Sequence, residues 1–336
     1  MKALPTLADV ARLSGVSTAT VSRALNEPGL VREGTRARVQ AAVKELGYTP
    51  HFGGRALASN RTNTVGAVIP TMENAIFARG LQALQEDLSE AGVTLLVATS
   101  GYDSEREARQ IRTLLGRGVD AMVLIGAARE EALHALLESR GVPVLLMWWW
   151  QRDCPWPCVG FDNRAAARAI AERVLAQGHR QIAMIAGIMR DNDRAAARVQ
   201  GVRDALGAAG VTLDHQAFIE APYQIDAAAA AATRLLATNP RPTAIICGND
   251  VLAAGAMRGI RAAGLSVPED VSVTGYDDIE LARLLDPPLT TVHVPHRRMG
   301  HAAAKMLLSL QTPDLEVESV ILDTEIVDRA SLSGPR

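Results

Sequence analysis

The feature that most constrains the fold is a regular alternation of short apolar runs and amphipathic stretches, which begins at Thr64. The runs "VGAVIP", "VTLLVAT", "AMVLIG" and "VPVLLMW" are separated by helical patterns such as "ARGLQALQEDLSEAG". After Asp162 a second series follows, with "QIAMIAG", "AFIEAP", "AIICGND" and "VSVTGYDD". Strands and helices in turn predict parallel sheets covered by helices on both faces. Two such series predict an α/β region of two doubly wound lobes.

Ligands of such sheets bind at the carboxyl ends of the strands, where this sequence places its unusual residues. No GxGxxG motif opens a helix, which argues against a dinucleotide-dependent enzyme. The sequence also shows neither a phosphate loop nor a recognisable pair of catalytic acid and base. We therefore predict a binding protein without enzymatic activity and without a cofactor.

Composition is typical of a soluble protein of two or three domains, since 48% of the 336 residues are apolar. No apolar run is long enough to span a membrane, and the N-terminus lacks the pattern of a secretion signal. These features predict a cytoplasmic location. Cys154, Cys158 and Cys247 are too few for a disulfide framework, so reduced thiols are expected.

Charge is distributed unevenly along the chain. Residues 1–62 contain nine Lys and Arg and four Asp and Glu, a net charge of +5, so the total of −2 leaves −7 for the remainder. A basic head on an acidic body is typical of a protein whose head binds a polyanion. A charged, solvated surface is the simpler alternative.

The head reads as three short helices. Thr6 can cap the first helix, "LSGV" then provides a turn, and Ser17 can cap a second helix over "TATVSRALN". A third helix is expected from about Thr35 to Leu46, ending at Gly47. Two helices joined by a tight glycine turn predict a helix-turn-helix motif, whose second helix enters the major groove of DNA. The alternative is a small helical bundle with solvated serines.

The sequence also resembles the LacI/GalR family of bacterial transcription repressors, most clearly in "TLADVARLSGVSTATVSRALN" and "RVQAAVKELGYTP", and along nearly the whole chain. The resemblance implies that Thr18 and Ala19 read bases and that Arg23 supports base and phosphate contacts. Thr18 and Ala19 would offer methyl groups to thymine. The predicted DNA-contacting residues are Thr6, Ser17, Thr18, Ala19, Thr20, Ser22, Arg23, Asn26 and Leu57.

Residues 51–63, "HFGGRALASNRTN", have the composition of a flexible linker. The resemblance instead implies a hinge helix that forms on operator DNA, with Leu57 wedged into the minor groove. Gly54 stands where the family usually has alanine, and glycine costs a helix about 1 kcal/mol relative to alanine.

The resemblance further implies two periplasmic-binding-protein-like lobes that enclose a small effector. The predicted divisions are a DNA-binding domain at 1–50, a hinge at 51–63, and an effector domain at 64–336, with the first lobe at about 64–162 and 293–322 and the second at about 163–292 and 323–336. Matching positions at strand ends predict the effector contacts Asn74, Phe77, Trp148, Asp162, Arg198, Tyr223, Asn249 and Asp277. For each of them the alternative role is a helix cap or a turn residue.

All tryptophans lie within "WWWQRDCPW". Trp148 directly follows a strand and could stack on a ligand ring, whereas one or two of the others are expected to pack against a helix. His293, His296 and His301 lie in a stretch that matches a crossover between lobes, so we predict no metal site there.

These observations together predict a homodimeric repressor that binds double-stranded operator DNA with an inverted repeat, since the symmetry of a dimer is matched by that of its site. The expected effector is a sugar, a sugar acid or a similar metabolite. A solute-binding protein of a transport system would share the two lobes. Such a protein would carry an export signal, however, and would have no DNA-binding head. A sugar-processing α/β enzyme is a further rival.

Overall fold

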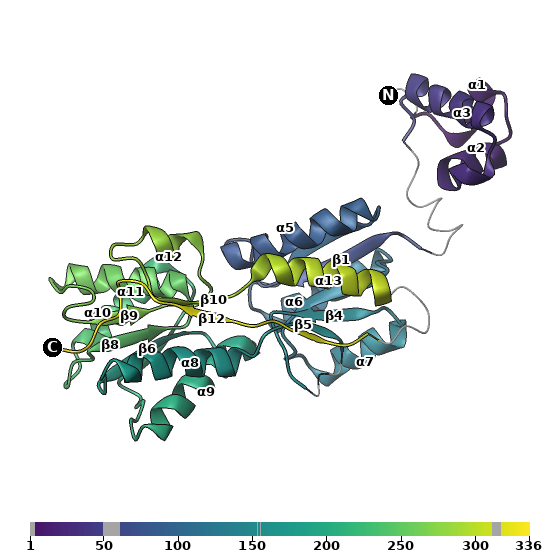
Figure 1. Ribbon diagram of the computed structural model, residues 1–336. Coiled ribbons are helices and arrows are strands. Elements are labelled where there is room, and N and C mark those ends of the chain that lie inside the picture. Colours follow the sequence, from purple (N-terminus) through teal and green to yellow (C-terminus); the bar gives the residue numbers. More distant parts are fainter. Residues whose placement is uncertain (1–3, 50–60, 153, 155, 311–316) are drawn as a thin grey trace. The chain divides into compact units, whose positions relative to one another are not determined.

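The computed structural model describes residues 4–49, 61–152, 154, 156–310 and 317–336. The chain divides into two compact units, Met1–Thr62 and Asn63–Arg336 (Figure 1). Leu57 and the remainder of the predicted hinge as far as residue 60 lie outside the described residues.

The smaller unit contains the helices α1 (Leu7–Ser14), α2 (Thr18–Asn26) and α3 (Glu33–Leu46). Thr6 caps α1 in a capping box with Asp9, and Gly15 ends it in the left-handed conformation at φ 67°. Ser17 caps α2 by accepting the N–H of Thr20. The predicted helix-turn-helix arrangement is therefore confirmed.

The unit differs from the sequence prediction in two details. A short 3₁₀ helix, η1 (Pro28–Leu30), lies between α2 and α3. The third helix begins at Glu33 rather than about Thr35, which places an acidic side chain in the first turn, where the helix dipole favours negative charge. The core of the small unit contains side chains from all three α-helices and from the chain just after α3. These residues are Val10, Ala11, Val21, Ala24, Val39, Ala42 and Tyr48.

The first lobe of the larger unit is built on a parallel sheet with the strand order β11-β5-β4-β3-β1-β2. Its strands are β1 (Thr64–Ile69), β2 (Thr94–Thr99), β3 (Ala121–Ile125), β4 (Val144–Met147), β5 (Cys158–Gly160) and β11 (Val320–Ile321). Its helices are α5 (Ala75–Glu90), α6 (Ser104–Gly116), α7 (Glu131–Arg140) and α13 (His296–Leu310). The strands β1, β3 and β4 are buried along their whole length, as expected for a sheet covered on both faces.

The second lobe is built on a parallel sheet with the strand order β7-β6-β8-β9. Its strands are β6 (Ile182–Gly187), β7 (Phe218–Ala221), β8 (Ala244–Cys247) and β9 (Ser272–Thr274). Its helices are α8 (Asn163–Ala176), α9 (Asp193–Ala208), α10 (Ile225–Leu236), α11 (Asp250–Ala262) and α12 (Glu280–Leu284). Each apolar run quoted from the sequence forms one strand of a lobe, so the predicted fold class is confirmed.

The lobes are joined where β5 leads into α8, where β10 (Thr291–His293) leads into α13, and where β11 leads into β12 (Glu325–Val327). Strands β10 and β12 pair antiparallel with each other, and the chain is seen to pass between the lobes beside them (Figure 1). Because these connections lie together, they allow the lobes to change their relative orientation about one region.

Candidate functional site

Helix α2 presents most of the predicted DNA-reading side chains to solvent. Val21 and Ala24 are buried against the rest of the small unit, whereas Thr18, Ala19, Arg23 and Asn26 are exposed. Thr20 and Ser22 are half-buried, and the predicted contacts Thr6 and Ser17 are exposed caps. Helix α2 thus has one face for the core and one face that remains available for a DNA groove.

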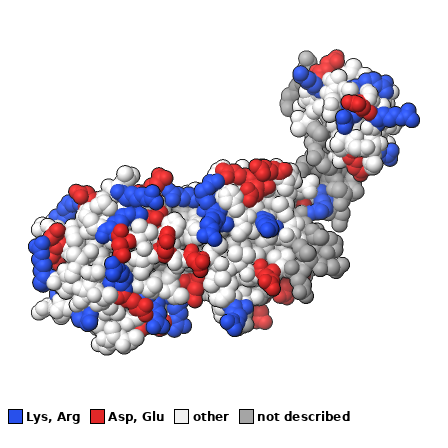
Figure 2. Space-filling model, viewed as in Figure 1, with Lys and Arg blue, Asp and Glu red and all other residues white. Residues whose placement is uncertain are grey.

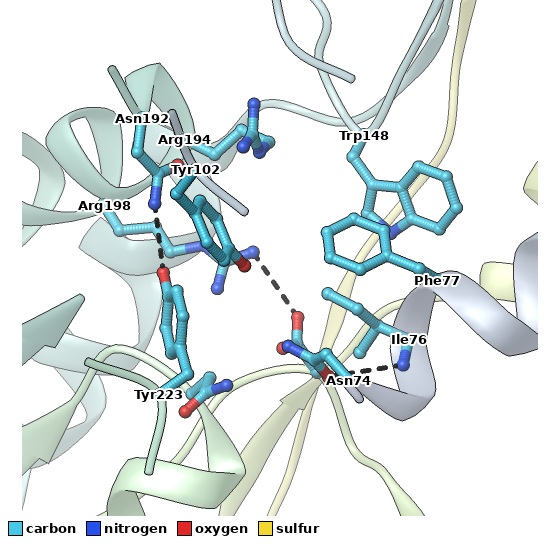
Figure 3. A pocket seen from close by; sticks show the side chains of 11 residues that line it. Asn74, Ile76, Phe77, Tyr102, Trp148, Asn192, Arg194, Arg198 and Tyr223 are labelled. Atoms are coloured by element: carbon cyan, nitrogen blue, oxygen red, sulfur yellow. Dashed lines mark hydrogen bonds and ion pairs between the residues drawn. The ribbon is translucent and has the colours of Figure 1, made fainter. Parts of the chain in front are cut away.

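A pocket with an empty volume of about 310 Å³ lies between the lobes, at the ends of the strands. Its lining residues come from both lobes and face one another (Figure 3). The lining comprises Asn74, Ile76, Phe77, Tyr102, Trp148, Asn192, Arg194, Arg198, Tyr223, Asn249 and Asp277. All predicted effector contacts except Asp162 are in this set.

Arg198 is the most heavily bonded side chain of the pocket, and it is only 6% exposed. Its Nε donates to Oδ1 of Asn163 at 3.0 Å, and its Nη1 donates to the carbonyl of Gly248 at 2.8 Å. Nη2 lies 3.4 Å from Oδ1 of Asp277, and the guanidinium lies 3.7 Å from the ring centre of Tyr276. Burial raises the pKa of Asp277 to about 6, although Arg198 acts in the opposite direction. Arg198 and Asp277 therefore form a desolvated pair at the base of the pocket.

Three helices begin at the pocket, and each is capped by an asparagine: Asn74 for α5, Asn192 for α9 and Asn249 for α11. Each Oδ1 accepts a backbone N–H of the first turn, from Ile76 at 3.4 Å, Ala195 at 3.3 Å and Leu252 at 2.9 Å respectively. The Nδ2 group of Asn192 donates to the hydroxyl of Tyr223 at 3.4 Å. For Asn74 and Asn249, no partner of Nδ2 is found within the described part of the chain. These amides therefore hold the helices with one atom and offer the other to the pocket.

Phe77 and Trp148 form the apolar side of the pocket (Figure 3). Their rings meet edge to face with a centroid distance of 5.1 Å. The indole N–H of Trp148 donates to Nδ1 of His296 at 3.2 Å, and a Cβ at Gly80 would lie 2.5 Å from the indole ring. Burial lowers the pKa of His296 to about 3, so the imidazole is neutral and accepts at Nδ1. Trp148 is only 1% exposed, so its position is fixed by the protein.

Sequence reasoning missed Ile76, Tyr102, Asn192 and Arg194. Tyr102 and Tyr223 come from different lobes, and their ring centres are 5.6 Å apart. Together with Asn74 and Asn192, they line both the inner pocket and an outer cleft with an empty volume of about 1670 Å³. These residues therefore separate the inner pocket from the opening of the cleft. Asn192 carried a usable signal, because it is a helix cap after a strand, as Asn74 and Asn249 are.

Asp162 lies outside the pocket lining. It caps α8, since its Oδ1 accepts the N–H of Ala165 at 2.9 Å. Its position after a strand is the same sequence signal that identified Asn249, and in the structure it has the alternative role of a helix cap.

The other tryptophans belong to the packing of the first lobe. Trp149, Trp150 and Trp156 lie against its apolar cluster, and His134 stacks on Trp156 with a centroid distance of 4.5 Å.

All cysteines are free thiols. The described residues contain no group of His, Cys, Asp and Glu that could hold a metal ion. In the same residues, no helix is both long and apolar enough to cross a lipid bilayer.

A helix-turn-helix unit joined to two parallel-sheet lobes around a polar pocket defines a DNA-binding regulator with a periplasmic-binding-protein-like domain. The family model for "Bacterial regulatory proteins, lacI family" matches residues 6–51, and the model for "Periplasmic binding protein-like domain" matches residues 171–332. The HTH-type transcriptional repressor PurR of Vibrio atlanticus is 34% identical over 332 residues, which cover 98% of this chain and 99% of the relative. The chain belongs to the LacI family and is a DNA-binding transcriptional repressor of that family.

Solved structures of the family agree with this assignment. A LacI-family regulator from Silicibacter pomeroyi matches with a TM-score of 0.89 and 30% identity, covering 98% of this chain and 99% of that one. The lac repressor dimer bound to operator and the anti-inducer ONPF matches with a TM-score of 0.86 and 27% identity, covering 98% and 100%. The complex of the regulator CelR with cellobiose matches with a TM-score of 0.71 and 34% identity, covering 97% and 99%. These relatives are regulators of transcription rather than enzymes.

Proposed function

We propose that this repressor binds an inverted-repeat operator as a homodimer and that a sugar or sugar-derived metabolite controls its affinity for DNA. The protein would act in the cytoplasm, where bacterial DNA is located. The observation that carries the proposal is the pocket, because its walls come from both lobes and combine aromatic rings with buried polar groups. Such a mixture is typical of sites that bind small polar molecules.

The proposed effector class follows from the side chains of the pocket. Phe77 and Trp148 offer an apolar surface to the carbon skeleton of a sugar, and Asn74, Arg198 and Asn249 offer hydrogen-bond donors to its oxygen atoms. The relative CelR is described as bound to cellobiose, which supports a carbohydrate ligand for this chain as well.

The proposed dimer and operator rest on the exposed face of α2 and on the similarity to the lac repressor, which is described as a dimer on its operator. One α2 helix reads only a few base pairs, so a dimer with two heads would read two related half-sites. Leu57 and the hinge would complete the contact with DNA, as the sequence predicts.

The proposed control works through the orientation of the lobes. Asn74 and Phe77 belong to the first lobe, whereas Arg198 and Tyr223 belong to the second. A ligand that contacts both lobes stabilises one orientation over the other, and that preference links effector affinity to operator affinity. Thermodynamic linkage requires that the factor by which the effector changes operator affinity equals the factor by which the operator changes effector affinity.

A calorimetric titration tests this proposal. The full-length protein is first screened by thermal unfolding against sugars, sugar acids, polyols and nucleobases, because a ligand at a hundredfold excess over its Kd stabilises a protein by about 2.7 kcal/mol. The best ligand is then titrated with and without operator DNA. An affinity that changes with operator supports the proposal, and an affinity that ignores operator contradicts it. A solute-binding protein would bind the ligand but show no operator affinity at all.

A further inference from the structure

We infer that the effector carries a carboxylate and is a polyhydroxy acid, such as an aldonate or a uronate, rather than the corresponding neutral sugar. This inference rests on the proposed function, because it narrows the ligand class of the same pocket. It is drawn from the hydrogen-bond donors and the helix N-termini that the pocket presents to its interior.

Hydrogen-bond donors dominate the lining of the pocket. Asn74 and Asn249 are 6% and 1% exposed, and each uses its Oδ1 to cap a helix, so that Nδ2 is left for a ligand. Asn192 repeats this arrangement, with a long 3.4 Å bond from Nδ2 to Tyr223. A neutral sugar hydroxyl both donates and accepts, whereas a carboxylate only accepts. A cavity lined by amide donors is therefore better matched to an acid.

The same asparagines mark helix N-termini that converge on the pocket. Helices α5, α9 and α11 all begin at its wall, and each N-terminus carries a partial positive charge. The unpartnered Nδ2 groups of Asn74 and Asn249 point to a ligand independently of these helix ends. Both features favour an anionic group inside the cavity.

Two arginine side chains add further hydrogen-bond donors to the lining. Arg194 and Arg198 are 8% and 6% exposed, and both line the pocket. The Nη1 group of Arg194 donates to Asp193 and to the carbonyl of Ile125, while no bond from its Nε or Nη2 is found among the described residues. Arg194 is paired with Asp193 and Arg198 with Asp277, so the two arginines contribute hydrogen-bond donors to the pocket rather than net charge.

The acidic residues that begin α9 and α11 are bonded within the protein, and Asp193 also pairs with Arg194 at 2.7 Å. The carboxylate of Asp193 accepts the backbone N–H groups of Ala127 and Ala128, and that of Asp250 accepts from the N–H of Ile279 and the hydroxyl of Thr291. Neither belongs to the lining.

Other carboxylates line the outer cleft, namely Glu73, Asp103, Glu105 and Asp191, and all are exposed. On the visible face of the molecule, acidic and basic side chains likewise lie side by side (Figure 2). Water and salt screen such exposed charges, whereas the buried groups of the pocket are screened much less.

Matched pairs of ligands test the inference by calorimetry on the full-length protein. The pairs are D-gluconate with D-glucose, D-galactonate with D-galactose, and D-galacturonate with D-galactose. We expect at least one acid to bind about tenfold or more tightly than its neutral partner, a difference of about 1.4 kcal/mol. A neutral sugar that binds as tightly as its acid overturns this inference and leaves the proposed function intact. If no acid binds while a neutral ligand from the thermal screen does, this inference is wrong and the proposed function stands.

Variants of Asn249 test whether its Nδ2 group donates to the ligand. The variant Asn249→Asp keeps an N-cap that is as good as asparagine, but it replaces the Nδ2 donor by an oxygen. The acid found above should bind at least about tenfold more weakly to this variant. Asn249→Ser also keeps a cap, adds no charge, and should give a smaller loss. Asp162→Asn, which changes the cap of α8 outside the pocket, is the matched control and should bind the acid as the wild type does. Undiminished binding by both Asn249 variants, with normal melting curves, overturns the inference.

Discussion

The carboxylate of Asp193, at the start of α9 in the second lobe, accepts the backbone N–H of Ala128 in the first lobe at 3.0 Å. The adjacent Arg194 donates from Nη1 to the carbonyl of Ile125 at 3.1 Å. Gly126 lies between these bonds at φ 74°, and a Cβ at that position would collide with both side chains. The lobes are thus joined beside the pocket by bonds of the protein itself.

Loss of this junction is expected to loosen the cleft. In Asp193→Ala, the amides of Ala127 and Ala128 lose their acceptor, so their hydrogen exchange should become faster than in the wild type. Hydrogen exchange measured by mass spectrometry checks this in the absence of ligand. Glu73→Ala is the control, since Glu73 lines the outer cleft and its carboxylate makes none of these bonds. Equal exchange at the two amides in all proteins would show that the junction does not hold the lobes.

Removal of Arg198 should affect both binding and stability. Arg198→Ala is expected to abolish the effector response and to lower the free energy of unfolding by about 3 to 5 kcal/mol, because Asp277 is left buried without its partner. Binding of ligand-free protein to operator should remain nearly intact, since the DNA-binding unit is unchanged. Calorimetry, denaturant unfolding and operator titration measure the three effects. Arg203→Ala, on the exposed side of the same helix, should leave all three unchanged. Normal effector binding by Arg198→Ala would refute its role as the anchor.

The exposed face of α2 gives a prediction about operator choice. Exchange of the residues at Thr18 and Ala19 should change which operator sequence is preferred, because both side chains are exposed on the DNA-reading face. Arg23→Ala should weaken specific binding by about 1 to 3 kcal/mol if Arg23 makes a bidentate base contact. Titrations at matched salt measure both. Unchanged affinity of both variants for the original operator would contradict the assignment of α2 as the recognition helix.

The buried carboxyl of Asp277 predicts a pH dependence of stability. Burial raises its pKa from 3.8 to about 6, so between these values the folded protein binds more protons than the unfolded chain. The contribution of Asp277 is therefore fully present at low pH, and it is lost as pH rises through about 6. His296 acts in the opposite direction, since burial lowers its pKa from 6.5 to about 3 and its contribution is lost as pH falls.

A comparison with Asp277→Asn separates these two effects. The variant cannot ionise at this position but retains His296, so the stability of the wild type minus that of the variant should fall between about pH 4 and pH 6 and level off above. Urea unfolding at a series of pH values measures this difference. A difference that rises over this range would mean that Arg198, rather than burial, controls the ionisation of Asp277.

Much of the fold could be predicted from sequence because it depends on local periodicity. The apolar runs that become β1 and β6 are buried along their length, and the glycines that end α1 and α3 lie in the left-handed conformation that glycine permits. The 3₁₀ helix at Pro28–Leu30 was missed, because three residues are too few to show a period.

The pocket was predicted less completely, because its membership depends on how helices are directed in space. Asn249 and Asp162 both follow a strand and cap a helix, yet only Asn249 reaches the pocket. Tyr102 lies in a turn after β2 at φ 60°, and no sequence motif marks that turn. It contacts Tyr223 because the two lobes approach each other there. Contacts between lobes are properties of tertiary structure and leave no local pattern.

The double use of the asparagine caps restricts how this pocket can evolve. Replacement of Asn74, Asn192 or Asn249 by an apolar residue would remove a ligand contact and also cost the helix that begins there about 1 kcal/mol. Exchange among asparagine, aspartate, serine and threonine keeps the helix start and changes only the polarity of the site. Descendants of this repressor can therefore acquire new effectors through substitutions among these capping residues, which alter the hydrogen bonds that the site offers. Substitution by apolar residues requires stability gained elsewhere in the protein.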